Sequence, residues 1–387
     1  MAAPVPSARA PRIVIAPDLP LGDAVRLTLA TAVAALTYYE AAATAGEIEP
    51  LHQMRVAARR LRAIVQLFSG VIHGSRVLVY KRDLPWFGQA AGAVRERDVI
   101  EALVRECGGR LDPALAGALT PLCTALAAER DTAHARFVAE LRTQRYTRMC
   151  ERLANPLLRR ALPAIAAGCE APAMIAPIAR SVRKAGKRIA REAPPEIFHR
   201  LRVRIKRLRY ALEMLAEMGG KRSRKALLRL EQMQELLGVH QDLVATAAWL
   251  RAFAANGTGV APETLMAVGA MLQALVVRRQ KLASRACRRW RKIVRSDVLD
   301  DALEEISRVA KERRESTRQA EVDAANAARI DPENAARAAE NLALAHDEDS
   351  LAASGAAQPM TPANDAQATP MPSVAPPTTS RPMDDNG

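Results

Sequence analysis

The chain has 387 residues, of which 49% are hydrophobic and 3% aromatic, and its formal net charge is +15. Ala, Leu, Arg and Glu dominate and β-branched runs are short, so we predict an all-α protein. The longest apolar stretch, 265–277, is too short to span a bilayer. The five cysteines show no C-x-x-C spacing and the start has no apolar leader. Both features predict a cytoplasmic protein with reduced thiols.

The charge is unevenly distributed along the chain. From Glu321 onward there are eleven acidic and three basic residues, whereas the part before Glu321 has 54 basic and 31 acidic residues, a net charge of +23. Such a cationic body predicts a polyanion as partner. We expect a flexible Pro-rich leader over 1–18 and a disordered acidic Ala- and Pro-rich tail over 316–387.

Helical periodicity fills the region between these two ends. The spacing of apolar residues predicts a first helix over 21–45, a second one after Pro50, and further helices up to about residue 154. A Pro-rich joint, 156–177, then separates two halves that repeat one plan. We therefore predict one domain over 19–315, composed of an N-terminal half, 19–155, and a C-terminal half, 175–315.

One motif occurs in both halves. Segment 52–62 reads HQMRVAARRLR and segment 199–209 reads HRLRVRIKRLR. At about 100° per residue, the first, fourth, eighth and eleventh positions of each segment lie on one helix face. These positions form the first stripe, His52, Arg55, Arg59 and Arg62, and the second stripe, His199, Arg202, Lys206 and Arg209.

Apolar residues flank each stripe, so each helix is expected to bury one side and direct its cations away from the core. They are Leu51, Met54, Ala58, Leu61, Val65 and Phe68 in one copy and Phe198, Leu201, Ile205, Leu208, Leu212 and Leu215 in the other. Beyond the stripes, Gly92 precedes Glu96 by four residues as Gly238 precedes Asp242. Two diverged copies predict an internal repeat.

These motifs resemble the CHAD domain, the conserved-histidine α-helical domain, over about residues 20–310. The resemblance is carried by the first stripe segment, by GAVRERDV at 92–99, and by the repeat from Phe198 to Glu213. It implies a duplicated helical bundle, with two pseudo-symmetric four-helix halves around a basic central groove or pore that binds inorganic polyphosphate, and association with polyphosphate granules. By motif position, the two stripes would be the ligand set. One departure is Glu96, where the family usually has Asp.

The residue types also suit a phosphate polymer when they are considered without the family. Arg grips two phosphate oxygens with a planar fork, and Lys acts as a compact point charge. We expect several basic helices to face a common space. Further candidate contacts are Arg60 and Arg207 in the motifs, Arg145 and Arg148 in the first half, and a third row, Arg278, Lys281, Arg285, Arg288, Lys292 and Arg295. Glu96, Asp98 and Asp242 are interpreted as supporting carboxylates that orient the guanidinium groups.

Several alternatives stay open. The stripes could be solvated faces with ion pairs at i,i+4, although no acid lies between His52 and Arg62 or between His199 and Arg209. Each stripe histidine could contact the ligand or only support the helix. A protein that binds nucleic acid or another polyanion is the nearest rival, because charge alone does not distinguish phosphate chains. Against nucleic acid, only Tyr210 offers a stacking surface beside a stripe. A polyphosphate-cleaving phosphohydrolase is the third alternative and lacks clustered carboxylates for two metals.

The sequence thus predicts a non-enzymatic polyphosphate-binding protein. No cofactor, no metal ion and no membrane span are expected. Granule-associated proteins are expected as further partners, and nucleic acid is less favoured because no recognition motif is present.

Overall fold

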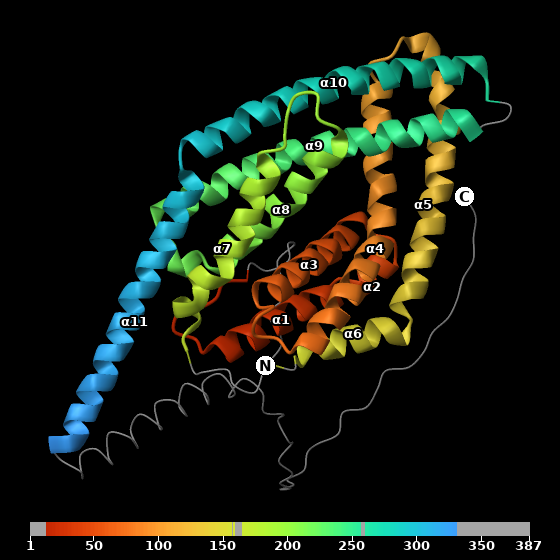
Figure 1. Ribbon diagram of the computed structural model, residues 1–387. Helices are drawn as coiled ribbons and strands as arrows, with labels where there is room; N and C mark the ends of the chain where they lie inside the picture. Colours follow the sequence, from red (N-terminus) through yellow and green to blue (C-terminus); the bar gives the residue numbers. More distant parts are fainter. Residues whose placement is uncertain (1–12, 157, 159–164, 257–259, 331–387) are drawn as a thin grey trace, which may run out of the picture. The chain divides into compact units, whose positions relative to one another are not determined.

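The computed structural model describes residues 13–156, 158, 165–256 and 260–330, and the features below lie in one compact unit that extends to Asp323. Within the described residues, regular structure is helical apart from two isolated β-bridges, which confirms the all-α prediction. The helices are α1 Leu21–Tyr38, α2 Glu40–Thr44, α3 Ile48–Leu67, α4 Gly74–Gly108, η1 Pro113–Leu119, α5 Thr120–Leu141, α6 Gln144–Ala154, α7 Ala167–Gly186, α8 Pro195–Met214, η2 Ala216–Met218, α9 Lys221–Asn256, α10 Pro262–Arg295 and α11 Val298–Ile330 (Figure 1).

The two stripe helices are α3 and α8, and they contact each other directly. α3 also packs against α1 and α4, while α8 packs against α7 and α9 (Figure 1). Each stripe helix is followed in the chain by a long helix, α4 in one case and α9 in the other. The two cationic motifs, 147 residues apart in the sequence, therefore lie in neighbouring helices.

The apolar sets beside the stripes form the centre of the main core. All twelve of these side chains are at most 4% exposed, as the helical periodicity predicts. They belong to one cluster that also includes residues of α1, α4, α6, α7 and α10. Because the core fixes the rotation of α3 and α8, the cations of each stripe point away from it.

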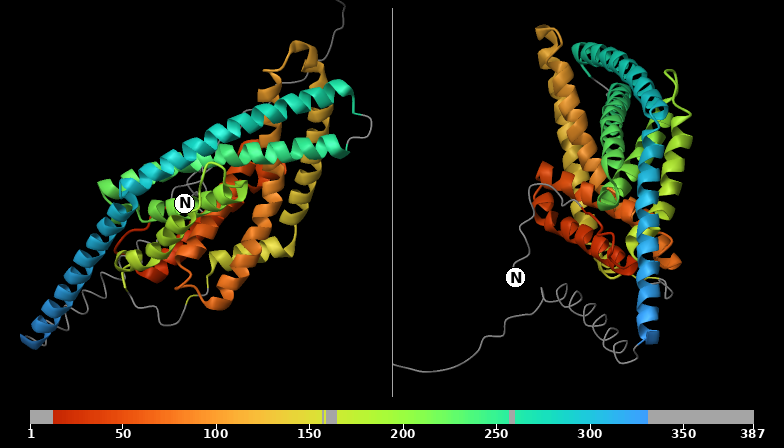
Figure 2. Two further views of the ribbon diagram at one scale, coloured as in Figure 1. Left: turned by 45° about the horizontal axis from the view of Figure 1, so that its top comes forward. Right: turned by 90° about the vertical axis from the view of Figure 1, so that its left-hand side faces the viewer.

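A second apolar cluster joins the distal parts of four long helices. It contains Ile100 of α4, Leu122 of α5, Leu243 of α9 and Met271 of α10. Figure 2 shows α9 and α10 running side by side over most of their length. The Trp249 indole Nε1–H donates to both oxygens of Glu129 on α5, at 3.0 and 3.1 Å. This cluster and hydrogen bond connect α4 and α5 to α9 and α10 beyond the stripe helices.

Several predicted boundaries differ from the structure. The first helix is divided at Tyr39 into α1 and α2. The predicted leader packs at its end, because Ile13 and Ile15 are buried and the Ile15 N–H donates to the Met214 carbonyl at 2.8 Å. At the other end, α11 continues to Ile330, past the predicted start of the tail at residue 316.

The predicted joint over 156–177 is also shorter in the structure. α7 begins at Ala167 and contains Pro172 and Pro177. Burial of its apolar side, including Ile175 and Ile178, offsets the backbone hydrogen bonds that the prolines lose. The rest of the leader and of the tail lies outside the described residues, and the internal repeat stays a prediction.

Candidate functional site

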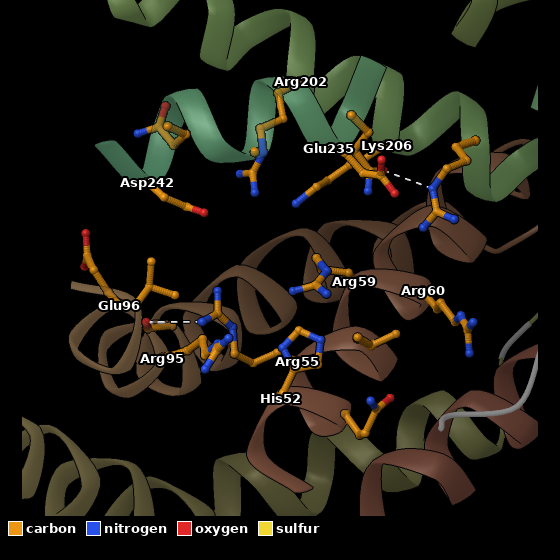
Figure 3. A pocket seen from close by; sticks show the side chains of 18 of the residues that line it. His52, Arg55, Arg59, Arg60, Arg95, Glu96, Arg202, Lys206, Glu235 and Asp242 are labelled. Atoms are coloured by element: carbon orange, nitrogen blue, oxygen red, sulfur yellow. Dashed lines mark hydrogen bonds between the residues drawn. The ribbon is translucent and has the colours of Figure 1, made fainter. Parts of the chain in front are cut away.

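A large cavity lies between the two stripe helices and the long helices that follow them. This first cavity has a volume of about 1350 Å³ and is lined by residues of α3, α4, α8 and α9. Figure 3 shows Arg55 and Arg59 on one side of the cavity and Arg202 and Lys206 extending toward them from the opposite side. The two stripes therefore meet across a space that a ligand can enter.

A second cavity, of about 810 Å³, borders the same cations. Arg55, Arg59, Arg202 and Lys206 line both cavities, and we call these four residues the cationic wall. Arg62, Lys81, His199 and Arg207 extend the basic lining in the second cavity. Among the described residues that line the second cavity, none is acidic.

The first cavity, in contrast, contains carboxylates, which lie beside particular arginines. Glu213 and Glu231 flank Arg209 as ion-pair partners, and Glu96 pairs with Arg97 at 3.3 Å. Arg209 also donates to Gln234 at 3.0 Å. Arg209 is thus largely neutralised within the protein, whereas the cationic wall has no ion pair among the described residues.

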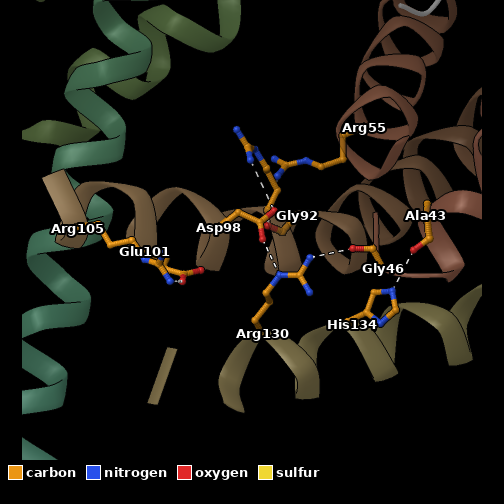
Figure 4. Close-up of polar contacts among 10 residues, drawn as sticks. Ala43, Gly46, Arg55, Gly92, Asp98, Glu101, Arg105, Arg130 and His134 are labelled. Atoms are coloured by element: carbon orange, nitrogen blue, oxygen red, sulfur yellow. Dashed lines mark hydrogen bonds and ion pairs between the residues drawn. The ribbon is translucent and has the colours of Figure 1, made fainter. Parts of the chain in front are cut away.

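Two guanidinium groups of the cationic wall have unused donors. The Nε atoms of Arg59 and Arg202 are buried and have no hydrogen-bond partner within the described part of the chain. Arg55 makes one long contact, from Nη1 to the Gly92 carbonyl at 3.4 Å (Figure 4). Because a buried donor without a partner costs about 1–3 kcal/mol, the wall is arranged for acceptors that the folded chain does not supply.

The pKa values of the wall show the same excess of positive charge. Burial, followed by the charges of Arg202, Arg59 and Arg55, lowers the pKa of the Lys206 amine to about 6. Burial and the neighbouring Arg59 and Arg95 lower the pKa of Arg55 to about 10. An anion between the stripes would reverse the electrostatic part of both effects.

The stripe histidines occupy different positions. His52 lines the first cavity, and its pKa is lowered by burial and then by Arg59 and Arg95. His199 is exposed, lines the second cavity, and has its Nδ1 atom 3.1 Å from Gln241 Oε1. His52 therefore lies deeper among the cations than His199 does.

The three predicted supporting carboxylates have distinct surroundings. Asp98 accepts a hydrogen bond from Arg130 Nε at 2.8 Å and lies 3.6 Å from Arg95 Nη1 (Figure 4). Glu96 and Asp242 lie at one end of the first cavity, on α4 and α9 (Figure 3). Burial raises the pKa of Asp242, against the opposing charges of Arg202 and Lys206.

The remaining predicted contacts lie in several places. Arg60 lines the first cavity. Arg145 stacks over the Trp86 ring at 4.2 Å and donates to Asp83 at 3.0 Å, while Arg148 is exposed on α6. In the third row, Arg278 pairs with Glu106 at 3.0 Å. The other five members are exposed on α10 and line neither cavity, so they do not share the space between the stripes: Lys281, Arg285, Arg288, Lys292 and Arg295.

Two residues of the site were not assigned from the sequence. Arg95 of α4 lines the first cavity, and its place in the segment GAVRERDV, three residues after Gly92, was the available signal. Tyr210 is 5% exposed, lines both cavities, and forms a side-chain hydrogen bond with Arg59. Burial opposes ionisation of Tyr210, but Arg59 and Arg209 outweigh it and lower its pKa.

Glycines let two arginines approach neighbouring helices. A Cβ atom at Gly88 of α4 would lie within van der Waals overlap of the Arg62 guanidinium, so the glycine leaves room for that side chain. At Gly238 of α9, a Cβ atom would be 3.7 Å from Arg202. Gly88 is thus required for the observed position of Arg62, whereas Gly238 only permits contact.

Comparison with known proteins shows the family. Residues 27–251 match the sequence profile of the CHAD domain, and the chain therefore belongs to the CHAD domain family. An uncharacterized protein of Mycobacterium tuberculosis, found in two strains, is 28% identical over 254 residues, which are 62% of this chain. The chain spans about half the length of these curated relatives, since the match covers 48% of them.

Solved structures agree with this membership. The crystal structure of the CHAD domain from the plant Ricinus communis superposes with a TM-score of 0.60 and 26% identity, and the match covers 74% of this chain and 96% of that one. PptA from Streptomyces chartreusis has a TM-score of 0.57 and 19% identity, with 70% and 99% of the two chains covered, and shows a shared fold. Among the described residues, no helix is long and apolar enough to cross a membrane.

Proposed function

We propose that this protein binds inorganic polyphosphate, without cleaving it, at the cationic wall. The observation that carries the proposal is the meeting of four cations from two helices, lining two cavities and without an ion pair to any residue that the structure describes. A phosphate chain offers acceptor oxygens along its whole length. It would satisfy the buried Nε donors of Arg59 and Arg202 and neutralise the mutual repulsion within the wall.

The position of the cations favours a slender polyanion over duplex nucleic acid. The cationic wall lies inside cavities between helices that contact each other. A duplex carries its phosphates on the outside of a wide rod and binds most readily to exposed faces. In addition, the tyrosines that line the second cavity, Tyr80 and Tyr210, are 1% and 5% exposed, and Tyr210 is hydrogen-bonded to Arg59, so neither offers an open stacking platform.

Family membership supports the same ligand, because the resemblance of the stripes to the CHAD motif implies polyphosphate binding. In this proposal, the protein is recruited to polyphosphate granules through the cationic wall, and granule-associated proteins are further partners. The exposed α10 row is not a contact of the ligand in the cavities, and it therefore provides a control surface of similar charge.

The test is a titration of the full chain with long-chain polyphosphate and, in parallel, with duplex DNA at two salt concentrations. The wall variant Arg59→Gln, Arg202→Gln, Lys206→Gln should lose most polyphosphate affinity. The control variant Arg285→Gln, Arg288→Gln, Lys292→Gln should keep it. Circular dichroism melting verifies that both variants fold.

Three results would contradict the proposal: tighter binding of DNA than of polyphosphate at equal salt, equal losses in the two variants, or release of phosphate during incubation with the polymer. Granule recruitment is tested separately with a fluorescently tagged chain. The wild type and the control variant should colocalise with granules, and the wall variant should be diffuse.

A further inference from the structure

The cations do not end at the second cavity. Arg207 of α8 lines the second cavity and also a third one, of about 560 Å³, between α3, α7 and α8. Gln66 and Ser69, near the end of α3, line both cavities as well. The second and third cavities are therefore adjacent and share a polar border with one guanidinium group.

A fourth, smaller cavity continues from the third. Arg204 lines the third cavity and also this one, of about 60 Å³, between α7 and α8. Its other charged lining residues are Lys184 of α7, Arg188, which lies two residues past the end of α7, and Arg200 of α8. Its apolar lining residues are Ala185 and Ile197, and no carboxylate belongs to its described lining.

The helical positions explain why these cations form a continuous path. Arg200, Arg204 and Arg207 are spaced at i, i+4 and i+7, so they lie along one side of α8 over about 10 Å. This side is away from the buried face that carries Leu201 and Ile205. Arg204 and Arg207 both line the third cavity, and burial and then the charge of Arg204 lower the pKa of Arg207.

The charge along this path is available to a ligand. Arg200, Arg204, Arg207, Lys184 and Arg188 form no ion pair within the described residues. The third cavity has one carboxylate in its described lining, Glu170, and it already pairs with Arg314 at 3.2 Å. A linear anion leaving the second cavity would thus meet these cations first at Arg207, then at Arg204, and then at Lys184, Arg188 and Arg200.

We propose that the anion path extends from the cationic wall around α8 to Lys184, Arg188, Arg200 and Arg204, and that this extension makes the protein prefer long polyphosphate chains over short ones. The inference rests on the proposed function. A short chain is accommodated at the cationic wall, where the cations are densest. Only a longer chain occupies the wall and the extension at once, so only a longer chain gains the additional contacts.

The test uses the full chain, tripolyphosphate as the short probe, and long-chain polyphosphate as the long probe. The extension variant is Lys184→Gln, Arg200→Gln, Arg204→Gln. The matched control, Arg285→Gln, Arg288→Gln, Lys292→Gln, also removes the charges of two arginines and one lysine, but from exposed positions of α10. Because exposed ion pairs contribute about 0.5 kcal/mol each, the extension variant should bind long chains about tenfold more weakly. Its affinity for tripolyphosphate, and both affinities of the control, should stay within about twofold.

Equal weakening for both probes, equal weakening in the control, or undiminished long-chain binding by the extension variant would each overturn the extension and leave the proposed function intact. Failure of the wild type to bind either probe would overturn the proposed function together with the extension. A second extension variant, Lys184→Gln, Arg188→Gln, changes only exposed side chains, one in α7 and one just past its end. It should show a smaller loss in the same direction, which makes the result independent of any effect of the α8 substitutions on folding.

Discussion

Binding of polyphosphate should be coupled to proton uptake at Lys206. In the free protein, burial and the charges of Arg202, Arg59 and Arg55 hold the pKa of this amine at about 6, and the one opposing charge is Asp242. The arginines of the wall stay charged at neutral pH, so Lys206 is the member that relieves the repulsion by losing its proton. A bound phosphate chain restores the charged form and raises this pKa.

The sign and size of the effect follow from that pKa. Below pH 6, Lys206 is already protonated in the free protein, so affinity does not depend on it. Above pH 6, binding must include protonation, and affinity falls by up to tenfold per pH unit until the pKa of the complex is reached. At pH 8, two units above the free pKa, protonation costs about 2.7 kcal/mol, or roughly a hundredfold in affinity.

Isothermal titration calorimetry at pH 8 measures this uptake directly. The binding enthalpy is recorded in buffers of different ionisation enthalpy, and the slope gives the number of protons taken up. The wild type should take up about one more proton than Lys206→Arg, because an arginine at this position stays charged. Lys206→Arg should also bind more tightly than the wild type at pH 8. Equal proton uptake by the two proteins would refute the reasoning, since it would show that Lys206 does not change its charge on binding.

Three further predictions follow. The affinity of the wild type for polyphosphate should fall steeply as the salt concentration rises, because binding releases counterions. A plot of the logarithm of the binding constant against the logarithm of the salt concentration should have a smaller slope for the wall variant, which releases fewer counterions. Equal slopes would show that the polymer is bound by cations outside the wall. His240 is 3% exposed with a pKa lowered to about 4 by burial and then by Arg279. The contribution of His240 to the free energy of unfolding should therefore decrease by about 3 kcal/mol as the pH falls from 6.5 through 4, since the unfolded chain takes up the proton first. In denaturant titrations, the loss of stability over this pH range should be larger by about this amount in the wild type than in His240→Leu, and equal losses would contradict the prediction. Gly186→Ala should lower the melting temperature, because the new Cβ atom would overlap the Trp290 ring. The control Gly269→Ala, whose Cβ atom would have nothing within 4 Å, should raise the free energy of unfolding by about 0.4–1 kcal/mol. An unchanged melting temperature in Gly186→Ala would mean that α7 and α10 are less closely packed than described.

Local patterns in the sequence determined the helices and their orientation about their own axes. The spacing of Leu51, Met54, Leu61 and their counterparts in α8 predicts which side of each helix is buried, and the structure buries all of them. The positions of the cations relative to that side follow from the geometry of one helix. For the same reason, the motif is sufficient to recognise the CHAD family, which the comparisons confirm.

Tertiary packing decided which cations share a space. The third row on α10 has the same helical spacing as the stripes, yet five of its members are exposed on the surface. Arg145 is held by Trp86 and Asp83 instead of lining a cavity. Periodicity specifies which side of a helix is buried but not which helix lies opposite, because that depends on apolar contacts between residues far apart in the chain.

The chemistry of the wall also depends on packing. The lowered pKa of Lys206 results from burial, from Arg202 on the same helix, and from Arg59 and Arg55, which belong to a helix about 150 residues earlier. Burial and charge act through distances in space, which the sequence does not contain. The sequence alone therefore determined the stripes and their family, and the contact between α3 and α8 decided that the stripes form one site with a path leading out around α8.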